Sequence, residues 1–566
     1  MMQTRRATPV DTIAETYLDE WAALDPSVAT YLGIPGHDDR LPALTPDWFA
    51  SRAALRARTS AALASATPTD ANDRITVAAL GQELELAAEL RAAGEDESDL
   101  RNIASPLQNV RDTFDLTPVA TVDDWAAVST RLGAVSSSID GYIESLRFAA
   151  DSGHVRPRRQ VRAGIEQCAD NVGPDGFFRT FAAHAQPESG DPLPASLKAD
   201  LARAGERASD AYARLSAYLS DELLPLAPDH DPVGRELYSL HSRSFLGARV
   251  DLEETYEWGQ QELARISALM AETAARIKPG ATVREAMAHL NGDPARTLHG
   301  TAELQAWMQS KSDAAVIALA DTHFDIPVEI RRLECLIAPT QIGGIYYTGP
   351  SEDLVTRPGR MWWSVPKGET EFATWSEIST VYHEGVPGHH LQIAQTVYRS
   401  NLLNRWRRLA SWVSGHGEGW ALYAERLMDD LGYLDDPGDL MGMLDSQSFR
   451  AARVVLDIGI HCDLPAPTEV GGGAWDYDKA WRFLAAHVSS SEGTRRFELD
   501  RYLGWPGQAP SYKVGERMWL QLREDARAKA ARDGVEFDLK AFHRSALDIG
   551  SVGLDVLRSA VLGEFD

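Results

Sequence analysis

The sequence predicts a large, irregular, mainly α-helical fold. Apolar residues recur three and four positions apart through long segments such as 75–93, 197–223 and 252–277, which is the spacing that gives a helix one apolar face. Proline and glycine interrupt the pattern, for example at 225–232 and 279–280, and such interruptions favour helix ends and turns. The segments follow no repeat of fixed period, so we expect an irregular array of helices.

Between residues 325 and 366 the helical pattern gives way to short runs typical of strands. Residues 326–330, 345–347 and 360–365 combine isoleucine, valine, tyrosine and tryptophan, with glycine and proline between the runs. We therefore expect a small β-sheet just before the motif described below. A free strand of this sheet could hydrogen-bond an extended peptide, and a purely structural hairpin explains the pattern equally well.

The chain of 566 residues is long enough for more than one folded unit. A proline-rich stretch at 223–232 favours a boundary there. We therefore predict an N-terminal helical lobe of residues 1–230 and a C-terminal lobe of residues 231–566 that carries most of the motifs. One continuous unit is the alternative, because large helical enzymes often grow around a single cleft.

The composition is that of a globular protein with a strong negative charge. Hydrophobic residues make up 44% of the chain and charged residues 25%, which supplies a sizeable core. The formal net charge is -27, whereas binding to a nucleic-acid backbone requires clustered lysine and arginine. We expect no nucleic-acid partner, and we interpret the one basic run, at 156–162, as the solvated start of a helix.

Cysteine usage and the N-terminus predict a cytoplasmic protein. Cys168, Cys335 and Cys462 are scattered without paired spacing, which favours neither disulfides nor a cysteine-ligated metal. Residues 1–7 run into polar residues and a proline, without the apolar core of a signal peptide. No apolar stretch reaches the length of a membrane span. We therefore expect a cytoplasmic location and no membrane partner, and the sequence leaves the oligomeric state open.

Residues 383–390, with the sequence HEGVPGHH, carry the strongest chemical signal. In the helical motif H-E-x-x-H, two histidines four positions apart bind zinc and the glutamate activates the zinc-bound water. His383 and Glu384 fit this motif, but Pro387 occupies the place of its second histidine. In an unbroken helix His390 would lie roughly 10 Å from His383 along the axis, too far for one ion with metal–nitrogen bonds of about 2 Å. We therefore predict that the helix bulges or breaks at the Pro-Gly pair.

The metal ligands expected from this pattern are His383, His390 and Glu418, with zinc as the ion. Glu418 follows far enough along the chain for a helix end, a turn and the start of another helix. His389 is the alternative to His390, and the histidine that does not bind metal is expected to be a transition-state donor or to support a ligand. Glu425, two turns after Glu418, is expected to orient a ligand histidine. Surface histidines and a helix-capping Glu418 would explain single features, but their conjunction favours a metal.

At these residues the chain resembles the uncharacterised bacterial domain-of-unknown-function family 885, whose hallmark looks like H-E-[AG]-x-P-G-H-H-x-Q. Residues 383–390 and Gln392 match the hallmark. Further matches cover nearly the whole chain and are densest in its second half, at 418–421, 450–453, 457–461, 506–509, 511–513, 537–543 and 550–554. That family is distantly similar to the Taq-type zinc carboxypeptidases and the thimet-type oligopeptidases. The resemblance implies a two-lobed, metallopeptidase-like helical fold with a deep cleft, and it implies no particular substrate.

A hydrolytic mechanism needs a general base and a donor for the oxyanion besides the metal. Glu384 is the expected base. Tyr512 is the first candidate donor, because Gly507 begins a loop that could bring its phenol to the site. His461 is the second candidate, and His389 is the third. Tyr512 or His461 alone is more often a packed structural residue, and the resemblance favours the catalytic interpretation.

A cation is expected to hold a carboxylate of the substrate. Arg453 and Lys513 are the candidates, and arginine is preferred because its planar guanidinium binds a carboxylate through two hydrogen bonds. Arg450 lies one helical turn before Arg453, so both could face one cleft. A salt bridge from Arg453 to Asp457 explains this arginine equally well.

The sequence thus predicts a zinc-dependent hydrolase that cleaves amide or peptide bonds of small peptides or peptide-like metabolites. Gln508 and Tyr347 are expected to line its substrate site, although Tyr347 also fits a strand-face aromatic. The alternatives are a metal-dependent enzyme acting on a non-peptide amide natural product and a catalytically inactive binding protein of the same fold. Intact His383, Glu384 and Glu418 argue against the inactive protein.

Overall fold

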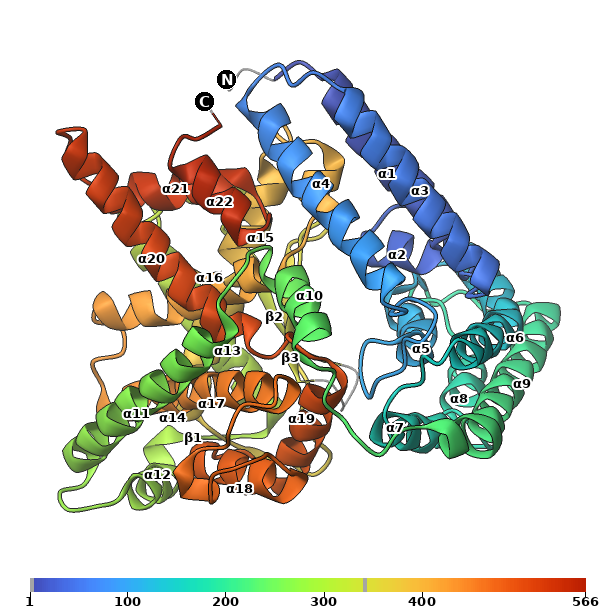
Figure 1. The fold of residues 1–566 in the computed structure, drawn as a ribbon. Coiled ribbons are helices and arrows are strands. Elements are labelled where there is room, and N and C mark those ends of the chain that lie inside the picture. The colour runs from blue at the N-terminus through green and yellow to red at the C-terminus, as the bar shows by residue number, and fades with distance from the viewer. Residues whose placement is uncertain (1–4, 339–343, 566) are drawn as a thin grey trace.

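The computed structural model describes residues 5–338 and 344–565 and confirms a mainly helical fold with little β-structure (Figure 1). Residues 1–4, part of the segment that we used to judge the N-terminus, lie outside the described residues. The helices up to residue 230 are α1 (Pro9–Leu24), α2 (Pro26–Tyr31), α3 (Pro46–Ser65), α4 (Ala71–Ala92), α5 (Pro106–Leu116), α6 (Val122–Asp151), α7 (Arg158–Ala169), α8 (Phe177–Ala183) and α9 (Ala195–Tyr218), followed by the helical turns η1 (Leu219–Leu223) and η2 (Leu224–Leu226).

The second half of the chain contains the remaining helices. They are α10 (Arg235–Leu246), α11 (Leu252–Ile277), α12 (Val283–Asn291), α13 (Gly300–Leu319), α14 (Thr374–Glu384), α15 (His389–Tyr398), α16 (Ser414–Asp430), α17 (Pro437–His461), α18 (Tyr477–His487), α19 (Glu492–Gly504), α20 (Ser511–Arg532), α21 (Leu539–Ile549) and α22 (Leu554–Val561), with the turns η3 (Pro294–Arg296), η4 (Val328–Ile330), η5 (Trp406–Ala410) and η6 (Thr468–Val470).

Local sequence explains where many of these helices begin. Thr8, Thr121 and Thr282 cap α1, α6 and α12, and each forms a capping box with an acidic residue three positions later. Proline occupies the first helical position of α1, α3 and α5, where its missing N–H costs no hydrogen bond. Helix starts of this kind are encoded within a few residues.

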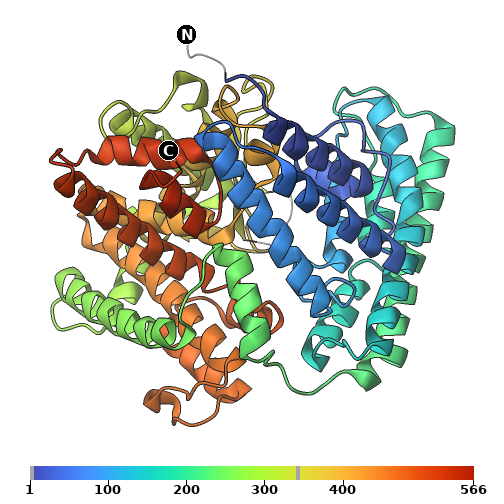
Figure 2. The ribbon, with the colours of Figure 1, turned by 45° about the horizontal axis from the view of Figure 1, so that its top comes forward.

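The described residues form two large hydrophobic clusters and a smaller one that includes Met308, Cys335 and Trp363. One large cluster lies within residues 44–227 and includes Phe114, Trp125 and Tyr212. The other large cluster joins helices of the second half to α1 and α4, with Leu18 and Leu80 among its members. Figures 1 and 2 show α4 next to α10 and α22, which it contacts. The division at residue 230 stays a prediction, and α1 and α4 share the core of the second half.

The β-structure consists of two small sheets in the described part of the chain. Strands β1 (Thr297–His299) and β5 (Glu371–Ala373) pair antiparallel, and β2 (Leu333–Ile337), β4 (Gly359–Trp363) and β3 (Ile345–Thr348) form a sheet in that order. The strands expected at 345–347 and 360–365 are confirmed as β3 and β4. The strand expected at 326–330 is wrong, because this segment contains the 3-10 turn η4, and β2 follows it instead.

One edge of the three-stranded sheet is already occupied. The side chain of Gln309, on α13, donates to the Leu333 carbonyl oxygen at 2.9 Å and accepts from the Cys335 amide at 3.0 Å. An extended peptide can therefore not pair with β2 at these groups. The proposed pairing of a peptide with a free strand is confined to the outer strand β3.

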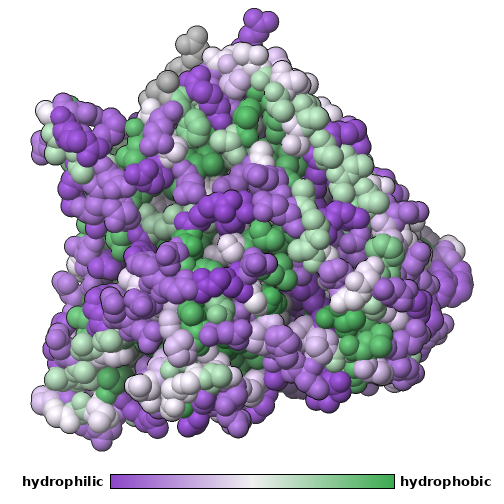
Figure 3. Space-filling model, in the orientation of Figure 1, coloured by the Kyte–Doolittle hydropathy of each residue, from purple (hydrophilic) through white to green (hydrophobic). Residues whose placement is uncertain are grey.

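The face of the molecule seen in Figure 3 is mostly polar. Figure 3 shows hydrophilic side chains over much of one face, with hydrophobic ones in smaller groups between them. Among the described residues, no helix combines the length and the apolar character needed to cross a membrane.

Candidate metal centre

The motif segment consists of two helices joined by a sharp turn. Helix α14 ends at Glu384 and α15 begins at His389, which confirms the predicted break. The Gly388 amide donates to the Tyr382 carbonyl oxygen at 3.1 Å. A Cβ atom at Gly388 would lie 1.9 Å from the His383 carbonyl oxygen, so this position admits only glycine. The turn also accepts a hydrogen bond from Trp420, whose indole N–H lies 2.9 Å from the Pro387 oxygen.

Two histidines and two glutamates converge at this turn. The Oε2 atom of Glu418, on α16, lies 3.3 Å from Nε2 of His383 and 3.4 Å from Nε2 of His389. The two imidazole rings are perpendicular, with centroids 4.8 Å apart. His383, Glu384 and His389 each offer one ligand atom within 4.8 Å of the others. These four side chains form what we call the His383 cluster.

His390, which we preferred as the metal ligand, is not part of the His383 cluster. Its Nε2 atom lies 2.8 Å from the Ile330 carbonyl oxygen and must donate to it, so Nδ1 accepts from the Tyr347 hydroxyl at 2.9 Å. Both ring nitrogens are thus used within the protein. The turn changes the direction of the chain, and the first histidine of α15, His389, faces His383 and Glu418 instead.

Glu425 supports the cluster from α16, as its spacing from Glu418 predicted. One of its carboxylate oxygens accepts from Nδ1 of His383 at 2.7 Å, and the other accepts from the hydroxyl of Ser379. Glu425 and Ser379 are both buried. Sequence reasoning missed Ser379, although it lies four positions before His383 on α14 and therefore on the same helical face.

The carboxylates of Glu418 and Glu425 favour a positive charge on His383, the ring that lies between them. Burial alone would lower the pKa of His383, but hydrogen bonds with Glu418 and Glu425 raise it to about 10. Burial opposes ionisation of Glu418, yet the adjacent imidazoles of His389 and His383 hold the pKa of its carboxyl well below the usual range. Burial raises the pKa of Glu384. Glu418 therefore stays ionised, and Glu384 takes up a proton more readily than an exposed glutamate.

Two buried polar atoms of the cluster have no hydrogen-bond partner in the described structure. They are Oε2 of Glu384 and Nδ1 of His389. Buried polar atoms are normally paired with protein or water. The unpaired carboxylate oxygen of Glu384 is therefore free to take a proton from water or substrate.

Tyr512 belongs to the start of α20 rather than to a loop. It is close enough to the His383 cluster for the charge of Glu418 to act on its hydroxyl. Burial and the charge of Glu418 raise the pKa of Tyr512 to about 12, so its hydroxyl keeps its proton at neutral pH and can donate. Tyr347 belongs to β3, and its hydroxyl lies 2.9 Å from Nδ1 of His390. Burial raises the pKa of Tyr347, with a further contribution from Glu384, but its hydroxyl is already engaged by His390.

An exposed aromatic residue beside the cluster was not predicted. Trp412 is 47% exposed, and its ring centroid lies 6.0 Å from that of His389. Its ring also fills the space where a Cβ of Gly417 would be. Trp412 lies just before α16, and nothing in its sequence context separates it from core tryptophans such as Trp420.

His461 does not join the His383 cluster. Its Nε2 atom lies 2.9 Å from the Tyr502 carbonyl oxygen and its Nδ1 atom accepts from the Val233 amide at 3.3 Å. The ring is fully buried, and burial lowers its pKa to about 4. His461 is therefore a neutral, hydrogen-bonded core histidine in this structure, which corrects its assignment as an oxyanion donor.

Both predicted substrate-binding cations pair with acidic residues of the protein. Arg453 pairs with Glu498 at 3.0 Å, not with Asp457 as the alternative interpretation had it. Lys513 is buried between Glu516 and Glu262, with its Nζ atom 3.0 Å from the Glu262 carboxylate. Lys513 therefore has little capacity left for a substrate carboxylate, and Arg453 shares its acidic partner, Glu498, with Arg501.

Gln508 is likewise engaged within the protein, because its side-chain oxygen accepts from the guanidinium of Arg501. Its expected role in substrate binding has no support from this contact. Asp457, the other partner considered for Arg453, accepts instead from the Tyr238 hydroxyl at 2.7 Å and from the Gly507 amide at 2.8 Å.

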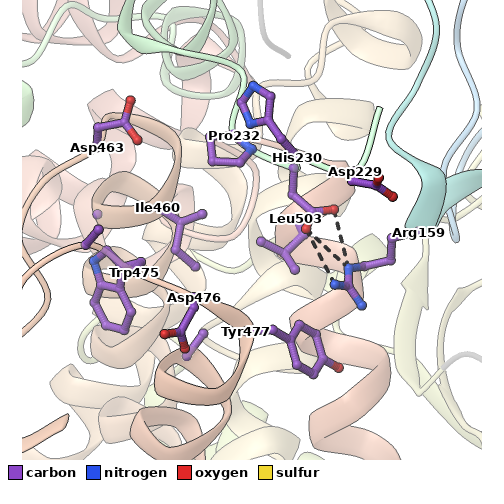
Figure 4. A pocket seen from close by; sticks show the side chains of 14 residues that line it. Arg159, Asp229, His230, Pro232, Ile460, Asp463, Trp475, Asp476, Tyr477 and Leu503 are labelled. Atoms are coloured by element: carbon purple, nitrogen blue, oxygen red, sulfur yellow. Dashed lines mark hydrogen bonds and ion pairs between the residues drawn. The ribbon is translucent and has the colours of Figure 1, made fainter. Parts of the chain in front are cut away.

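A cavity of about 330 Å³ lies elsewhere, where α7 and residues 229–232 meet α17, α18 and α19. Figure 4 shows Arg159 and Tyr477 at its wall. The guanidinium of Arg159 pairs with Asp231 and lies over the ring of Tyr477, 4.2 Å from the ring centroid. The basic run at 156–162 therefore begins a helix as expected, but this arginine is ion-paired rather than solvated. None of the residues that line the cavity belongs to the His383 cluster.

The fold and the cluster define a large helical protein with a buried group of histidines and glutamates that could hold a metal ion. A family described as "Bacterial protein of unknown function (DUF885)" matches residues 26–561. The chain belongs to this family, as the resemblance indicated. No curated protein matches the chain.

Two solved structures share the fold over nearly their whole length. One is "the putative lipoprotein from Colwellia psychrerythraea", with a TM-score of 0.84 and 23% identity over 98% of this chain and 99% of that one. The other is "a putative lipoprotein of unknown function from Shewanella oneidensis", with a TM-score of 0.73 and 16% identity over 98% of this chain and 99% of that one. Both descriptions contradict the cytoplasmic location expected from the sequence, and that expectation is withdrawn.

Proposed function

We propose that the protein is a zinc-dependent hydrolase that cleaves amide or peptide bonds of small peptides or peptide-like metabolites. One observation carries the proposal: two imidazoles and the carboxylate of Glu418 meet around one point, with Glu384 beside them. The proposal includes a two-lobed, metallopeptidase-like architecture in which a cleft gives substrates access to this point.

The donor set fits zinc. His383, His389 and Glu418 would hold the ion, and two histidines with one glutamate are a known set for catalytic zinc that leaves a position open. Zinc bound there would polarise a carbonyl group and make water more acidic. Glu425 holds the His383 ring in place through Nδ1, which leaves Nε2 for the metal, as is common for ligand histidines.

The chain's own residues supply the proton transfers. Glu384 has an unpaired, buried carboxylate oxygen and a pKa raised by burial. Such a group suits a general base that takes a proton from the attacking water and passes it to the leaving amine. The phenol of Tyr512 keeps its proton at neutral pH and would donate to the oxygen that gains charge in the transition state.

The test combines metal analysis with activity. We expect purified wild-type protein to contain about one zinc ion per chain and to cleave members of a panel of dipeptides and N-acyl amino acids. Glu384→Gln should keep the zinc and lose roughly 10²- to 10⁴-fold in turnover, as expected when a general base is removed. Glu377→Gln, on the same helix α14, is the matched control and should keep both.

Each alternative gives a different result. Absence of a stoichiometric transition metal in wild type, with no change in His383→Ala, would refute the metal centre. Equal activity of wild type and Glu384→Gln would remove Glu384 as the base. Zinc in the protein without turnover of any amide in the panel would contradict the proposed substrate class and favour the alternatives, an enzyme acting on a non-peptide amide natural product or a binding protein of the same fold.

A further inference from the structure

We infer that the substrate carries a carboxylate next to the amide that is cleaved, and that the guanidinium of Arg450 binds this carboxylate. The inference rests on the proposed function, because it assigns a substrate class to the same site. Arg450 belongs to α17, which packs against α14, the helix that ends in His383 and Glu384 (Figure 1). The two helices are so close that a Cβ at Gly442 would lie 2.0 Å from the Trp375 carbonyl oxygen.

Arg450 differs from the neighbouring cations in having no acidic partner. In the described structure its guanidinium makes one hydrogen bond, from Nη1 to the Ser446 carbonyl oxygen of its own helix at 3.2 Å, and takes part in no ion pair. Its Nε atom is buried without any acceptor. One turn later, Arg453 is paired with Glu498 and Tyr502. A half-buried guanidinium with an unused donor is costly to maintain unless a ligand supplies the acceptor.

Helix α17, which carries Arg450, contacts three helices of the proposed site. They are α14 with His383 and Glu384, α16 with Glu418, and α20 with Tyr512. Arg453, by contrast, lies against the Tyr512 ring, 5.0 Å from its centroid, and is ion-paired with Glu498, which it shares with Arg501.

The positive charge of Arg450 indicates that the substrate group it binds is negatively charged. A site that recognised the amino group of a peptide would need an unpaired carboxylate, whereas a free guanidinium binds a carboxylate through two parallel hydrogen bonds. A carboxylate one residue from the cleaved bond is present in N-acyl amino acids and at the C-terminus of peptides. We therefore assign these two kinds of molecule to the site, with release of a single amino acid.

Binding tests the inference without turnover. The probes are the N-acetyl derivatives of several amino acids and the corresponding amides, titrated into zinc-loaded Glu384→Gln protein. At least one acid should bind about tenfold or more tightly than its amide, and the added change Arg450→Gln should remove this difference. Arg450→Lys should restore part of it, and Arg527→Gln, on the surface of α20, should leave it unchanged.

Activity provides the second measurement. Wild type should cleave free acids with at least tenfold higher kcat/KM than their amides, and Arg450→Gln should lose this preference while keeping its zinc. The inference is overturned if no acid binds better than its amide, or if Arg450→Gln keeps the preference. If acids bind better but nothing is cleaved, the assignment of Arg450 stands and the proposed hydrolysis fails.

Discussion

The hydrogen bond between Glu425 and His383 offers a direct test of how the cluster holds metal. In Glu425→Gln the side chain keeps its size and an acceptor oxygen for Nδ1 of His383, which lies 2.7 Å from the carboxylate. In the wild-type protein the hydroxyl of Ser379 donates to Glu425. In the variant this hydroxyl can rotate to accept from the new amide, because a hydroxyl both donates and accepts. The substitution therefore removes mainly the negative charge.

Loss of that charge should weaken zinc binding. Replacing a carboxylate that supports a metal-bound histidine typically reduces affinity roughly 10- to 100-fold, which corresponds to about 1.4–2.7 kcal/mol. The proton that competes with zinc is also bound less tightly in the variant, because Glu425 helps to raise the pKa of His383 to about 10. Proton competition in wild type weakens as the pH rises toward that value. The difference in zinc affinity between wild type and variant should therefore grow from pH 7 to pH 9.

Competition with a fluorescent zinc chelator at pH 7, 8 and 9 measures this difference. Circular dichroism and the melting temperature check that the variant is folded. Ser379→Ala is the matched control, because it removes a contact of Glu425 without removing its charge, and its effect should be smaller. Unchanged zinc affinity in Glu425→Gln at all three pH values, with zinc bound in wild type, would refute the reasoning.

Two further predictions concern the ligand and acid stability. His389→Gln should remove stoichiometric zinc, whereas His390→Gln should keep it, because both ring nitrogens of His390 form hydrogen bonds with Ile330 and Tyr347. Elemental analysis of the two purified variants measures the zinc content. The opposite result would restore His390 as the ligand. Burial of His543 lowers its pKa from 6.5 to about 3, so the unfolded chain takes up the proton more readily. The contribution of the neutral His543 ring to the free energy of unfolding is fully present above pH 6.5. It declines as the pH falls toward 3. From pH 6.5 to pH 5 the loss is about 2 kcal/mol. Urea unfolding at pH 7, 6 and 5 should show a smaller decline for His543→Gln than for wild type, and identical declines would contradict this account.

The helices could be predicted because their signals are local. The apolar spacing at 75–93, 197–223 and 252–277 lies largely within α4, α9 and α11, since each helix forms its hydrogen bonds within its own segment. The strand expected at 326–330 failed for the opposite reason. Ile326 and Ile330 are buried, so their apolar character reflects burial of a 3-10 turn. A strand depends on partners elsewhere in the chain, and β2 pairs in parallel with β4 across more than twenty residues.

Which cation is available to bind the substrate carboxylate could likewise not be predicted from the sequence, because it depends on partners elsewhere in the chain. Arg450 and Arg453 lie three positions apart on α17, and their sequence context offers no reason to rank them. What separates them is Glu498 on α19, which forms an ion pair with Arg453 and not with Arg450. Lys513 is excluded as a substrate-binding cation by its ion pair with Glu262, a residue of α11 that is distant in sequence. Tertiary ion pairs decide which charge is left for a ligand.

The ambiguity between His389 and His390 has a different physical origin. Helical periodicity relates side chains only as long as the helix continues, and α14 ends at Glu384. Beyond the turn, the orientation of α15 depends on Gly388, which packs against the His383 carbonyl, and on the hydrogen bond from Trp420 to Pro387. Trp420 belongs to the same helix as Glu418 and Glu425. The helix that provides the carboxylates therefore also sets the rotation of α15 that turns His389, and not His390, toward them.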